Sequence, residues 1–316
     1  MKVTDNIKNA NQTLFSFEIL PPLKGKSIQS IYDGIDPLME FNPKFVNVTY
    51  HREEYIYKEK DNGLLEKVSI RKRPGTVGIC AAIMNKYKVD AIPHLICGGF
   101  SKEETENALI DLQFLGIDNV LALRGDPIKT ENTFKAHPKG HQYASDLIHQ
   151  VDDMNHGKYC IDDIKMAPTD FCIGAAGYPE KHFEAMNLKT DLIHLKEKVD
   201  AGATYIVTQM FFDNKKYFDF VKACRNFGID VPIIPGMKPI KTLNHITFLP
   251  KFFHIDYAEE LSSGLLKCKT NAEVEKVGIE WGIEQSKELM KEGVPCIHYY
   301  TMSNSDAVKA IANQIF

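Results

Sequence analysis

Polar side chains stand at the carboxyl ends of six of the eight apolar runs that the sequence predicts to be strands. These residues are Glu18, Thr49, His94, Arg124 together with Asp126, Tyr178 and Gln209. Taken singly, each is typical of a loop cap or a solvated edge. Six strands that end in this way favour one shared site, because the carboxyl ends of parallel strands open onto a common edge or mouth. Two carboxylates, a guanidinium, an imidazole and an amide would meet there.

Side chains alternate between the two faces of an extended strand, so residues two apart share a face. The pairs that share a face in this way are Ser16 with Glu18, Asn47 with Thr49, and Arg124 with Asp126. Glu18 has apolar neighbours on both sides, so we expect burial to raise the pKa of its carboxyl and suit it to donate a proton. Asp126 lies beside Arg124 and is expected to stay ionised. A structural Arg–Asp pair with a buried glutamate is the alternative interpretation.

A helix predicted over 188–203 adds a second feature. Asp191, His194 and Lys198 follow one another at i, i+3 and i+7, so they share one helix face. Such a face fits a ribose and a pyrophosphate, and it equally fits an ordinary solvated helix surface.

Strand and helix patterns alternate along the chain, which predicts parallel strands joined by right-handed crossovers. The predicted strands are Phe15–Leu20, Phe45–Tyr50, Ala91–Cys97, Asn119–Asp126, Phe171–Pro179, Tyr205–Phe212, Val231–Met237 and Cys296–Met302. The predicted helices cover 27–40, 74–87, 101–116, 143–156, 188–202, 214–227, 241–254 and 305–315, with an extra helix at 271–292 before the last strand. Eight units predict a (β/α)8 TIM barrel. A doubly wound open sheet is the alternative.

The chain of 316 residues contains no linker or internal repeat that would divide it, so we expect one domain over 1–316. The charged stretch 51–73 is interpreted as a solvated loop and helix face. The extra helix 271–292 carries Val274, Val277 and Trp281 on one face, which favours core packing over a subunit contact.

Composition excludes several classes of protein. The 38 basic and 42 acidic residues give a net charge of −4, which argues against nucleic acid or a membrane surface as partner. No apolar run suits a signal peptide or a membrane span, and seven scattered cysteines favour a reducing cytoplasm. The sequence lacks GxGxxG, P-loop, HExxH and GxSxG motifs, and its eleven histidines show no metal-ligand spacing, so we expect no metal.

A series of short motifs runs in order over about residues 14 to 302. They are Phe15-Ser-Phe-Glu-Ile-Leu-Pro-Pro22, Val48-Thr-Tyr50, Pro93-His-Leu-Ile-Cys97, Leu123-Arg-Gly-Asp126, Tyr143-Ala-Ser-Asp-Leu147, Ala176-Gly-Tyr-Pro-Glu-Lys-His182, Leu195-Lys-Glu-Lys-Val-Asp-Ala-Gly-Ala203, Thr208-Gln-Met-Phe-Phe-Asp213, Ile234-Pro-Gly236, Gly293-Val294 and His298-Tyr-Tyr-Thr301. One such motif would be weak, but the ordered series is specific, and it resembles the methylenetetrahydrofolate reductase family. The length resembles that of the bacterial catalytic subunit.

This resemblance implies a (β/α)8 flavoprotein with non-covalently bound FAD. It implies that NADH or NADPH reduces the flavin in a ping-pong reaction. The reduced flavin would then convert 5,10-methylenetetrahydrofolate to 5-methyltetrahydrofolate, the methyl source for methionine synthesis. It also implies a cytoplasmic homo-oligomer. The alternatives are another flavin barrel oxidoreductase, similar to proline dehydrogenase, and a catalytically silent barrel that binds folate or flavin.

By resemblance, Glu18 matches the general acid, Asp126 the carboxylate near the flavin that also contacts the pterin, and Gln209 an amide that serves both substrates. The implied flavin-contacting residues are Thr49, Tyr50, His94, Arg124, Gly125, Asp126, Tyr143, Ala144, Tyr178, His182, Asp191, His194 and Lys198. The implied substrate-binding residues are Glu18, Asp126, Gln209, His245, Leu249 and Asn304.

The chain departs from the family pattern at four positions. His194 and Glu197 stand where bacterial relatives commonly carry Asn and Arg, so a positive charge near the flavin is lost. Leu249 replaces a Phe that packs on substrate in some bacterial members. Asn304 replaces an Arg that meets the glutamate tail of the folate in many members. We therefore expect altered retention of FAD and altered binding of the folate tail.

Overall fold

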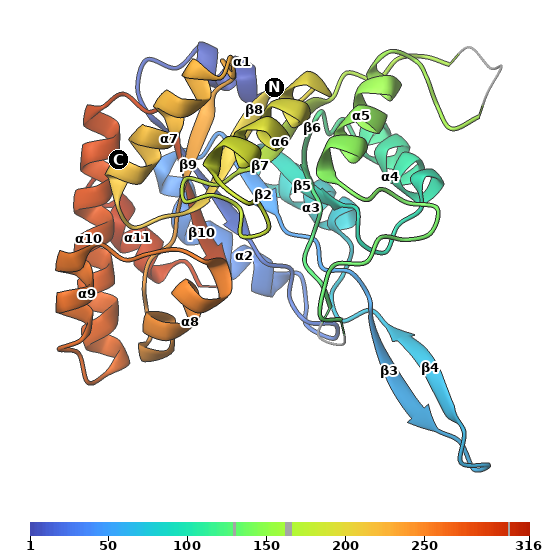
Figure 1. The fold of residues 1–316 in the computed structure, drawn as a ribbon, viewed down its shortest axis with the longest axis horizontal. Coiled ribbons are helices and arrows are strands. Elements are labelled where there is room, and N and C mark those ends of the chain that lie inside the picture. The colour runs from blue at the N-terminus through green and yellow to red at the C-terminus, as the bar shows by residue number, and fades with distance from the viewer. Residues whose placement is uncertain (129–130, 162–165, 303) are drawn as a thin grey trace.

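Eight parallel strands close into a barrel in the computed structural model, which describes residues 1–128, 131–161, 166–302 and 304–316 (Figure 1). Their order around the barrel is β1-β10-β9-β8-β7-β6-β5-β2, and β2 pairs with β1 to close it. The strands are β1 (Leu14–Ile19), β2 (Phe45–Val48), β5 (Asp90–Ile96), β6 (Asn119–Leu123), β7 (Cys172–Gly177), β8 (Tyr205–Met210), β9 (Ile233–Met237) and β10 (Cys296–Met302). The prediction of a (β/α)8 barrel is confirmed, and the open sheet is excluded.

Helices follow the strands as the alternation predicts. They are α2 (Gln29–Ile35) with the 3-10 helix Asp36–Phe41, α3 (Thr76–Tyr87), α4 (Lys102–Phe114), α5 (Ala144–Asn155), α6 (Leu188–Asp200), α7 (Asn214–Asn226), α8 (Leu243–Phe253) and α11 (Asp306–Ala312). Ser101 caps α4 through a reciprocal pair of hydrogen bonds with Glu104, which satisfies free backbone donors at the helix start. Two short helices, α1 (Val3–Lys8) and α9 (Glu259–Leu265), were not predicted.

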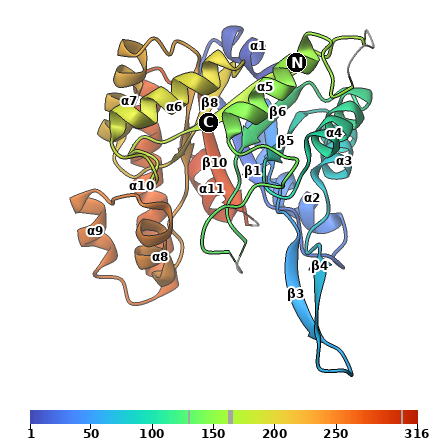
Figure 2. The ribbon, with the colours of Figure 1, turned by 45° about the vertical axis from the view of Figure 1, so that its right-hand side comes forward.

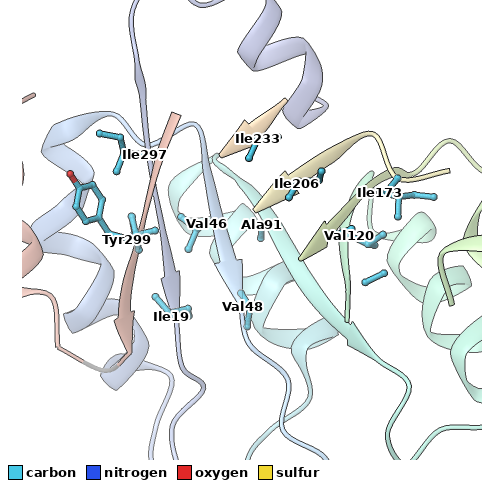
Figure 3. Close-up of a cluster of buried hydrophobic side chains, with 14 of the residues drawn as sticks. Ile19, Val46, Val48, Ala91, Val120, Ile173, Ile206, Ile233, Ile297 and Tyr299 are labelled. Carbon is cyan, nitrogen blue, oxygen red and sulfur yellow. The ribbon is translucent and has the colours of Figure 1, made fainter. Parts of the chain in front are cut away.

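Alternation along each strand separates two cores. Figure 3 shows the outward side chains of the barrel strands, such as Ile173, Ile206 and Ile297, which pack in the core beneath the helices. The inward side chains near the amino ends of the strands form a second apolar cluster. That cluster comprises Leu14, Phe45, Ile92, Leu121, Cys172, Tyr205, Val207, Ile234 and Cys296, and Val3 of α1 packs against it. The amino end of the barrel is therefore filled mainly by apolar side chains.

The extra helix α10 (Asn271–Lys291) packs on the barrel, as the sequence favoured. Val274 is fully buried, and the indole Nε1 of Trp281 donates to the carbonyl of Phe212 at 3.1 Å. A Cβ at Gly278 would lie 2.0 Å from the carbonyl oxygen of Ile240, so only glycine permits this close approach. The core interpretation of this helix is confirmed.

The prediction of a loop and helix face for the stretch 51–73 is wrong. This stretch forms an antiparallel hairpin of β3 (Glu54–Glu59) and β4 (Leu65–Ile70), which projects from the barrel (Figures 1 and 2). The turn contains Gly63 at φ 74°, a left-handed conformation that glycine adopts without strain. The high density of charge hid the alternation of aromatic and β-branched residues that forms these strands.

Candidate active site

The carboxyl end of β1 places Glu18 at the centre of the predicted site. Its backbone pairs with Tyr300 of β10 on one side and with Asn47 of β2 on the other. The side chain is only 7% exposed, and burial raises the pKa of its carboxyl to about 8, against an opposing effect of Lys238. The raised pKa agrees with the expectation from the sequence. At neutral pH Glu18 is therefore a protonated acid.

His94 of β5 lies beside Glu18, with its Nε2 3.4 Å from the Glu18 Oε2 atom. Burial lowers the pKa of the His94 imidazole to about 3. Both groups are then uncharged at neutral pH, so this contact is not an ion pair. A neutral acid beside a neutral imidazole retains a proton that can be delivered to a bound ligand.

Buried polar side chains continue below Glu18 into the barrel. Ser16 Oγ lies 2.9 Å from Nδ1 of His298, and Asn47 Nδ2 lies 3.3 Å from Nε2 of His94. Asn47 Oδ1 and His298 Nε2 have no hydrogen-bond partner in the described part of the chain. The Ser16–Glu18 and Asn47–Thr49 faces therefore point into the barrel, as their spacing predicted.

The loop after β6 corrects the prediction for Arg124 and Asp126. β6 ends at Leu123, and Gly125 at φ 84° turns the chain, so the two residues do not continue a strand face. Arg124 instead makes a bidentate ion pair with Glu184, at 2.5 and 2.9 Å. Asp126 is exposed at the barrel mouth. Its pairing with Arg124, expected from the sequence, is replaced by the Glu184 contact.

A second group of predicted residues gathers around β7 and α6. The rings of Tyr178 and His182 meet edge to face at 4.7 Å, and the backbone N–H of His182 donates to Asp191 at 3.1 Å. Lys198 Nζ donates to the carbonyl of Ala176 at 3.0 Å. Burial and the charge of Arg124 lower the pKa of His182 to about 4, and they also lower the pKa of Lys198. His182 is therefore neutral at neutral pH, and the charges of Arg124 and Lys198 repel each other.

The remaining predicted flavin residues lie at the rim. Tyr143 is 56% exposed at the start of α5, while Ala144 is buried. His194 lies on the exposed side of α6 and pairs with Glu197 at 3.0 Å. Thr49 is buried and its Oγ1 has no hydrogen-bond partner among the residues described.

The predicted substrate residues separate into two groups. Gln209 lies half-buried at the end of β8, and His245 lies half-buried at the start of α8. Asn304 accepts a hydrogen bond at its Oδ1 from Lys241 Nζ. Leu249, by contrast, is 1% exposed and packs in a cluster with Met210 and Ile240. The structure therefore buries Leu249 in this apolar cluster.

A cavity of about 920 Å³ extends from the barrel mouth toward the hairpin and the start of α3. Of the predicted site residues, Tyr50 and His94 line it. Charged side chains of both signs line it: Lys26, Arg52, Lys67, Arg71 and Lys135 with Glu53, Glu104 and Glu131. Arg52 is paired with Glu131, so the lining has a modest excess of positive charge. The cavity leaves room for an extended ligand.

Three residues of the site were missed from the sequence. Glu184, which pairs with Arg124, comes from an irregular segment and left no signal. Tyr300 donates its hydroxyl to the carbonyl of Thr208 at 2.6 Å and lies beside Glu18. Lys238 follows β9 directly, so the search for polar residues at strand ends would have found it if extended one residue past the predicted strand.

Two classes of partner receive no support in the described ranges. No group of three or more His, Cys, Asp or Glu side chains there could hold a metal ion. No helix in the same ranges is long and apolar enough to cross a membrane.

The fold and site define a class, the (β/α)8 barrels with a polar ligand site at the carboxyl ends of their strands. Within that class, the chain belongs to the methylenetetrahydrofolate reductase family, whose family model matches residues 2–315.

Individual relatives agree. The chain is 31% identical to 5,10-methylenetetrahydrofolate reductase of Escherichia coli K12, over 95% of this chain and 90% of that protein. It is 33% identical to methylenetetrahydrofolate reductase (NADH) 1 of Arabidopsis thaliana, over 96% of this chain and 49% of that protein. The chain thus spans about half the length of the eukaryotic relatives it matches.

A solved structure from Clostridium thermocellum shares the fold, with a TM-score of 0.57 and 15% identity over 98% of this chain and 96% of that one. That protein is described as binding two copies of 5-methyl-5,6,7,8-tetrahydrofolic acid. At this identity the likeness supports the fold alone.

Proposed function

We propose that this chain reduces 5,10-methylenetetrahydrofolate to 5-methyltetrahydrofolate with NADH or NADPH, using bound FAD. Family membership supports the reaction, and one observation carries the mechanism. Glu18 is a buried carboxyl, protonated at neutral pH, at the point where the strands converge. A reaction that adds hydride and a proton needs such an acid.

Glu18 supplies the proton that opens the methylene bridge. The methylene carbon is bonded to N5 and N10 of the folate, and protonation of N10 allows that C–N bond to break. The resulting N5 iminium accepts hydride at the methylene carbon and becomes the N5-methyl group. Glu18 is left as a carboxylate and takes up a proton before the next turnover.

The residues around β7 and α6 fit the diphosphate of FAD. The charges of Arg124 and Lys198 repel each other, and an anion placed between them relieves this repulsion. The neutral imidazole of His182 can donate one further hydrogen bond. The unpartnered Thr49 Oγ1 is free to bond a polar edge of the cofactor. When bound, FAD supplies hydride transfer, whereas the protein orients the rings and sets the local charge.

The side-chain amide of Gln209 can hydrogen-bond to the nicotinamide in one half-reaction and to the pterin in the other. Its Oε1 accepts from the backbone N–H of Met210 at 2.9 Å, so its orientation is fixed. The amide NH2 has no bond to another described residue and is left to donate to nicotinamide or pterin oxygens. Asp126 is exposed at the mouth, and in this proposal it accepts hydrogen bonds from the pterin.

Lys241 compensates for the missing arginine at position 304. Its ammonium donates to Asn304 Oδ1 and lies 3.7 Å from Glu275. A cation therefore stands at the place where the resemblance puts the glutamate tail of the folate. We propose that Lys241 with Asn304 binds the tail carboxylates.

An anaerobic assay of the two half-reactions tests this function. Purified protein loaded with FAD should lose its yellow colour with NADH or NADPH, and methylenetetrahydrofolate should restore it. Restoration by a proline-derived imine instead would favour the other oxidoreductase class, and no bleaching with either nucleotide would favour a silent barrel. Comparing NADH with NADPH also settles the nucleotide preference. The homo-oligomer implied by the resemblance stays a prediction.

A further inference from the structure

Lys238 lies in the barrel mouth, two strands away from Glu18. It follows directly after β9, whose Gly236 and Met237 pair with His298 and Tyr299 of β10. One further step in this parallel register places Lys238 beside Tyr300, and Tyr300 pairs with Glu18 in β1. Met237 packs in the outer core, so alternation turns Lys238 to the inside. Lys238, Tyr300 and Glu18 thus form one row across β9, β10 and β1.

A lysine in this position is not explained by an ion pair. Among the residues described, no carboxylate lies within ion-pair distance of its ammonium, and Glu18 and Lys241 are the charged neighbours that act on it. Burial lowers the pKa of Lys238 to about 8, so folding disfavours its charge. An unpaired, half-buried lysine is unfavourable for stability, which suggests a functional reason for it.

We propose that Lys238 is a positioning residue for proton transfer, whose ammonium sets the pH range over which Glu18 holds its proton. This inference rests on the proposed function of Glu18 as the acid. After Glu18 donates its proton, a carboxylate remains in a dry site. The Lys238 ammonium stabilises that carboxylate until a proton returns.

The histidines and tyrosines around Glu18, Tyr300 and Lys238 are uncharged at neutral pH. Burial lowers the pKa values of His94 on β5 and His298 on β10 to about 3, and that of His245 on α8 to about 4. Burial raises the pKa values of Tyr300 on β10 and Tyr178 on β7. Lys241 is engaged by Asn304 and Glu275. Lys238 is therefore the charged group of the row.

The coupling has a defined sign. A nearby cation favours the carboxylate over the acid, so Lys238 lowers the pKa of Glu18 from the value that burial alone would give. Removing the cation strengthens the hold of Glu18 on its proton and slows its release. A permanently charged side chain at position 238 weakens that hold.

The test compares the pH profiles of folate reduction in the wild-type holoenzyme, Lys238→Met and Lys238→Arg. Methionine keeps most of the aliphatic stem without the charge. We expect the high-pH fall in rate to move upward by about one pH unit in Lys238→Met. In Lys238→Arg it should stay at the wild-type pH or move downward, because the guanidinium does not deprotonate. Lys287→Met, at an exposed lysine of α10 that pairs with Glu284, controls for loss of one charge.

A second readout does not depend on activity. The free energy of unfolding is measured with denaturant between pH 5 and 10 in two pairs of proteins. The first pair is the wild type and Glu18→Gln, and the second is Lys238→Met and the double variant Lys238→Met/Glu18→Gln. The pH above which the difference in unfolding free energy within a pair stops changing reports the titration of Glu18 in the folded state. This pH should be higher in the second pair, which lacks Lys238.

Equal midpoints in both pairs, or a lower plateau rate without a shift, would overturn the role of Lys238. A shift in the unfolding data from a protein that does not reduce folate would instead leave the coupling intact and refute the proposed function.

Discussion

Each side of the barrel mouth carries an acidic and a basic side chain, but the two sides differ in whether these groups make contact. On the β1, β10 and β9 side, Glu18 and Lys238 are a carboxyl and an amine without direct contact. On the β6, β7 and α6 side, Glu184 and Arg124 form a bidentate pair near the surface. Burial raises the pKa of Glu18, whereas the hydrogen bonds of Arg124 lower the pKa of Glu184.

This difference assigns different tasks to the two sides. A carboxyl that is desolvated and loosely coupled keeps a proton and can transfer it. A carboxylate held by a guanidinium keeps its charge and positions that guanidinium. The β1 side is thus suited to proton transfer, and the β7 side to binding an anionic cofactor.

The largest expected effect comes from Glu18→Gln. The amide keeps the shape of the side chain but provides no acid, so folate reduction should fall by about a hundred- to ten-thousand-fold. Reduction of the bound flavin by NADH should change little, because that half-reaction does not use the proton of Glu18. Stopped-flow spectroscopy of each half-reaction measures both rates. Equal losses in the two halves would show that the two sides of the mouth are not functionally distinct.

The same substitution should change the pH dependence of stability. The folded-state pKa of Glu18 is raised from 4.5 to about 8. The stability that the protonated Glu18 contributes to the folded state is therefore fully present below pH 4.5 and is lost as the pH rises through 8. Relative to Glu18→Gln, the wild type should lose about 1.4 kcal/mol of unfolding free energy per pH unit across this range. Urea unfolding at several pH values measures the difference. A constant difference between the two proteins would show that Glu18 is ionised in the folded state.

Lys198→Met probes the opposite side of the mouth. Loss of one charged hydrogen bond to a diphosphate should weaken FAD binding by roughly ten- to a hundredfold. Lys196→Met is the matched control, because Lys196 lies on the same helix and pairs with Asp200 at the surface. Fluorescence titration of the apoprotein with FAD measures both affinities. If both variants bound FAD as the wild type does, the β7 side would not be the diphosphate site.

The strands and their inward faces were predictable because the physics is local. Period-two alternation located Glu18 and Asn47 on the interior, and it gave β10 its observed bounds. The same pattern extended β6 too far, since nothing in the sequence reveals that Gly125 adopts a left-handed turn. Asp126 consequently lost its predicted strand face and its pairing with Arg124.

Contacts between residues far apart in the chain could not be predicted from the sequence. The partner of Arg124 is 60 positions away, in a segment without a pattern, and Lys241 meets Asn304 across 63 positions. Burial of Leu249 depends on α9, a helix too short to have left a periodic signal. The position of polar residues at the carboxyl ends of the strands was therefore predictable, whereas their pairing partners were not. That the barrel is a single domain stays a prediction.

Asn304→Arg should have the smallest effect. The resemblance alone suggests that restoring an arginine would tighten binding of a glutamate-bearing folate. The ammonium of Lys241 already contacts this exposed position. A second positive charge at position 304 would therefore add only an exposed ion pair with the folate tail, worth about 0.2–1 kcal/mol. We therefore expect at most about a fivefold gain in affinity for a glutamate-bearing folate, measured by titration of the reduced enzyme.

The comparison with Lys241→Met decides whether that cation belongs to the tail site. If Lys241 binds the tail, its removal should weaken affinity more than Asn304→Arg strengthens it, and adding Asn304→Arg should restore most of the loss. A gain far above fivefold from Asn304→Arg alone, with no effect of Lys241→Met, would show that Lys241 does not bind the tail. Lys238 and Lys241 would then both belong to the side of the mouth that carries Glu18, and neither would bind the tail.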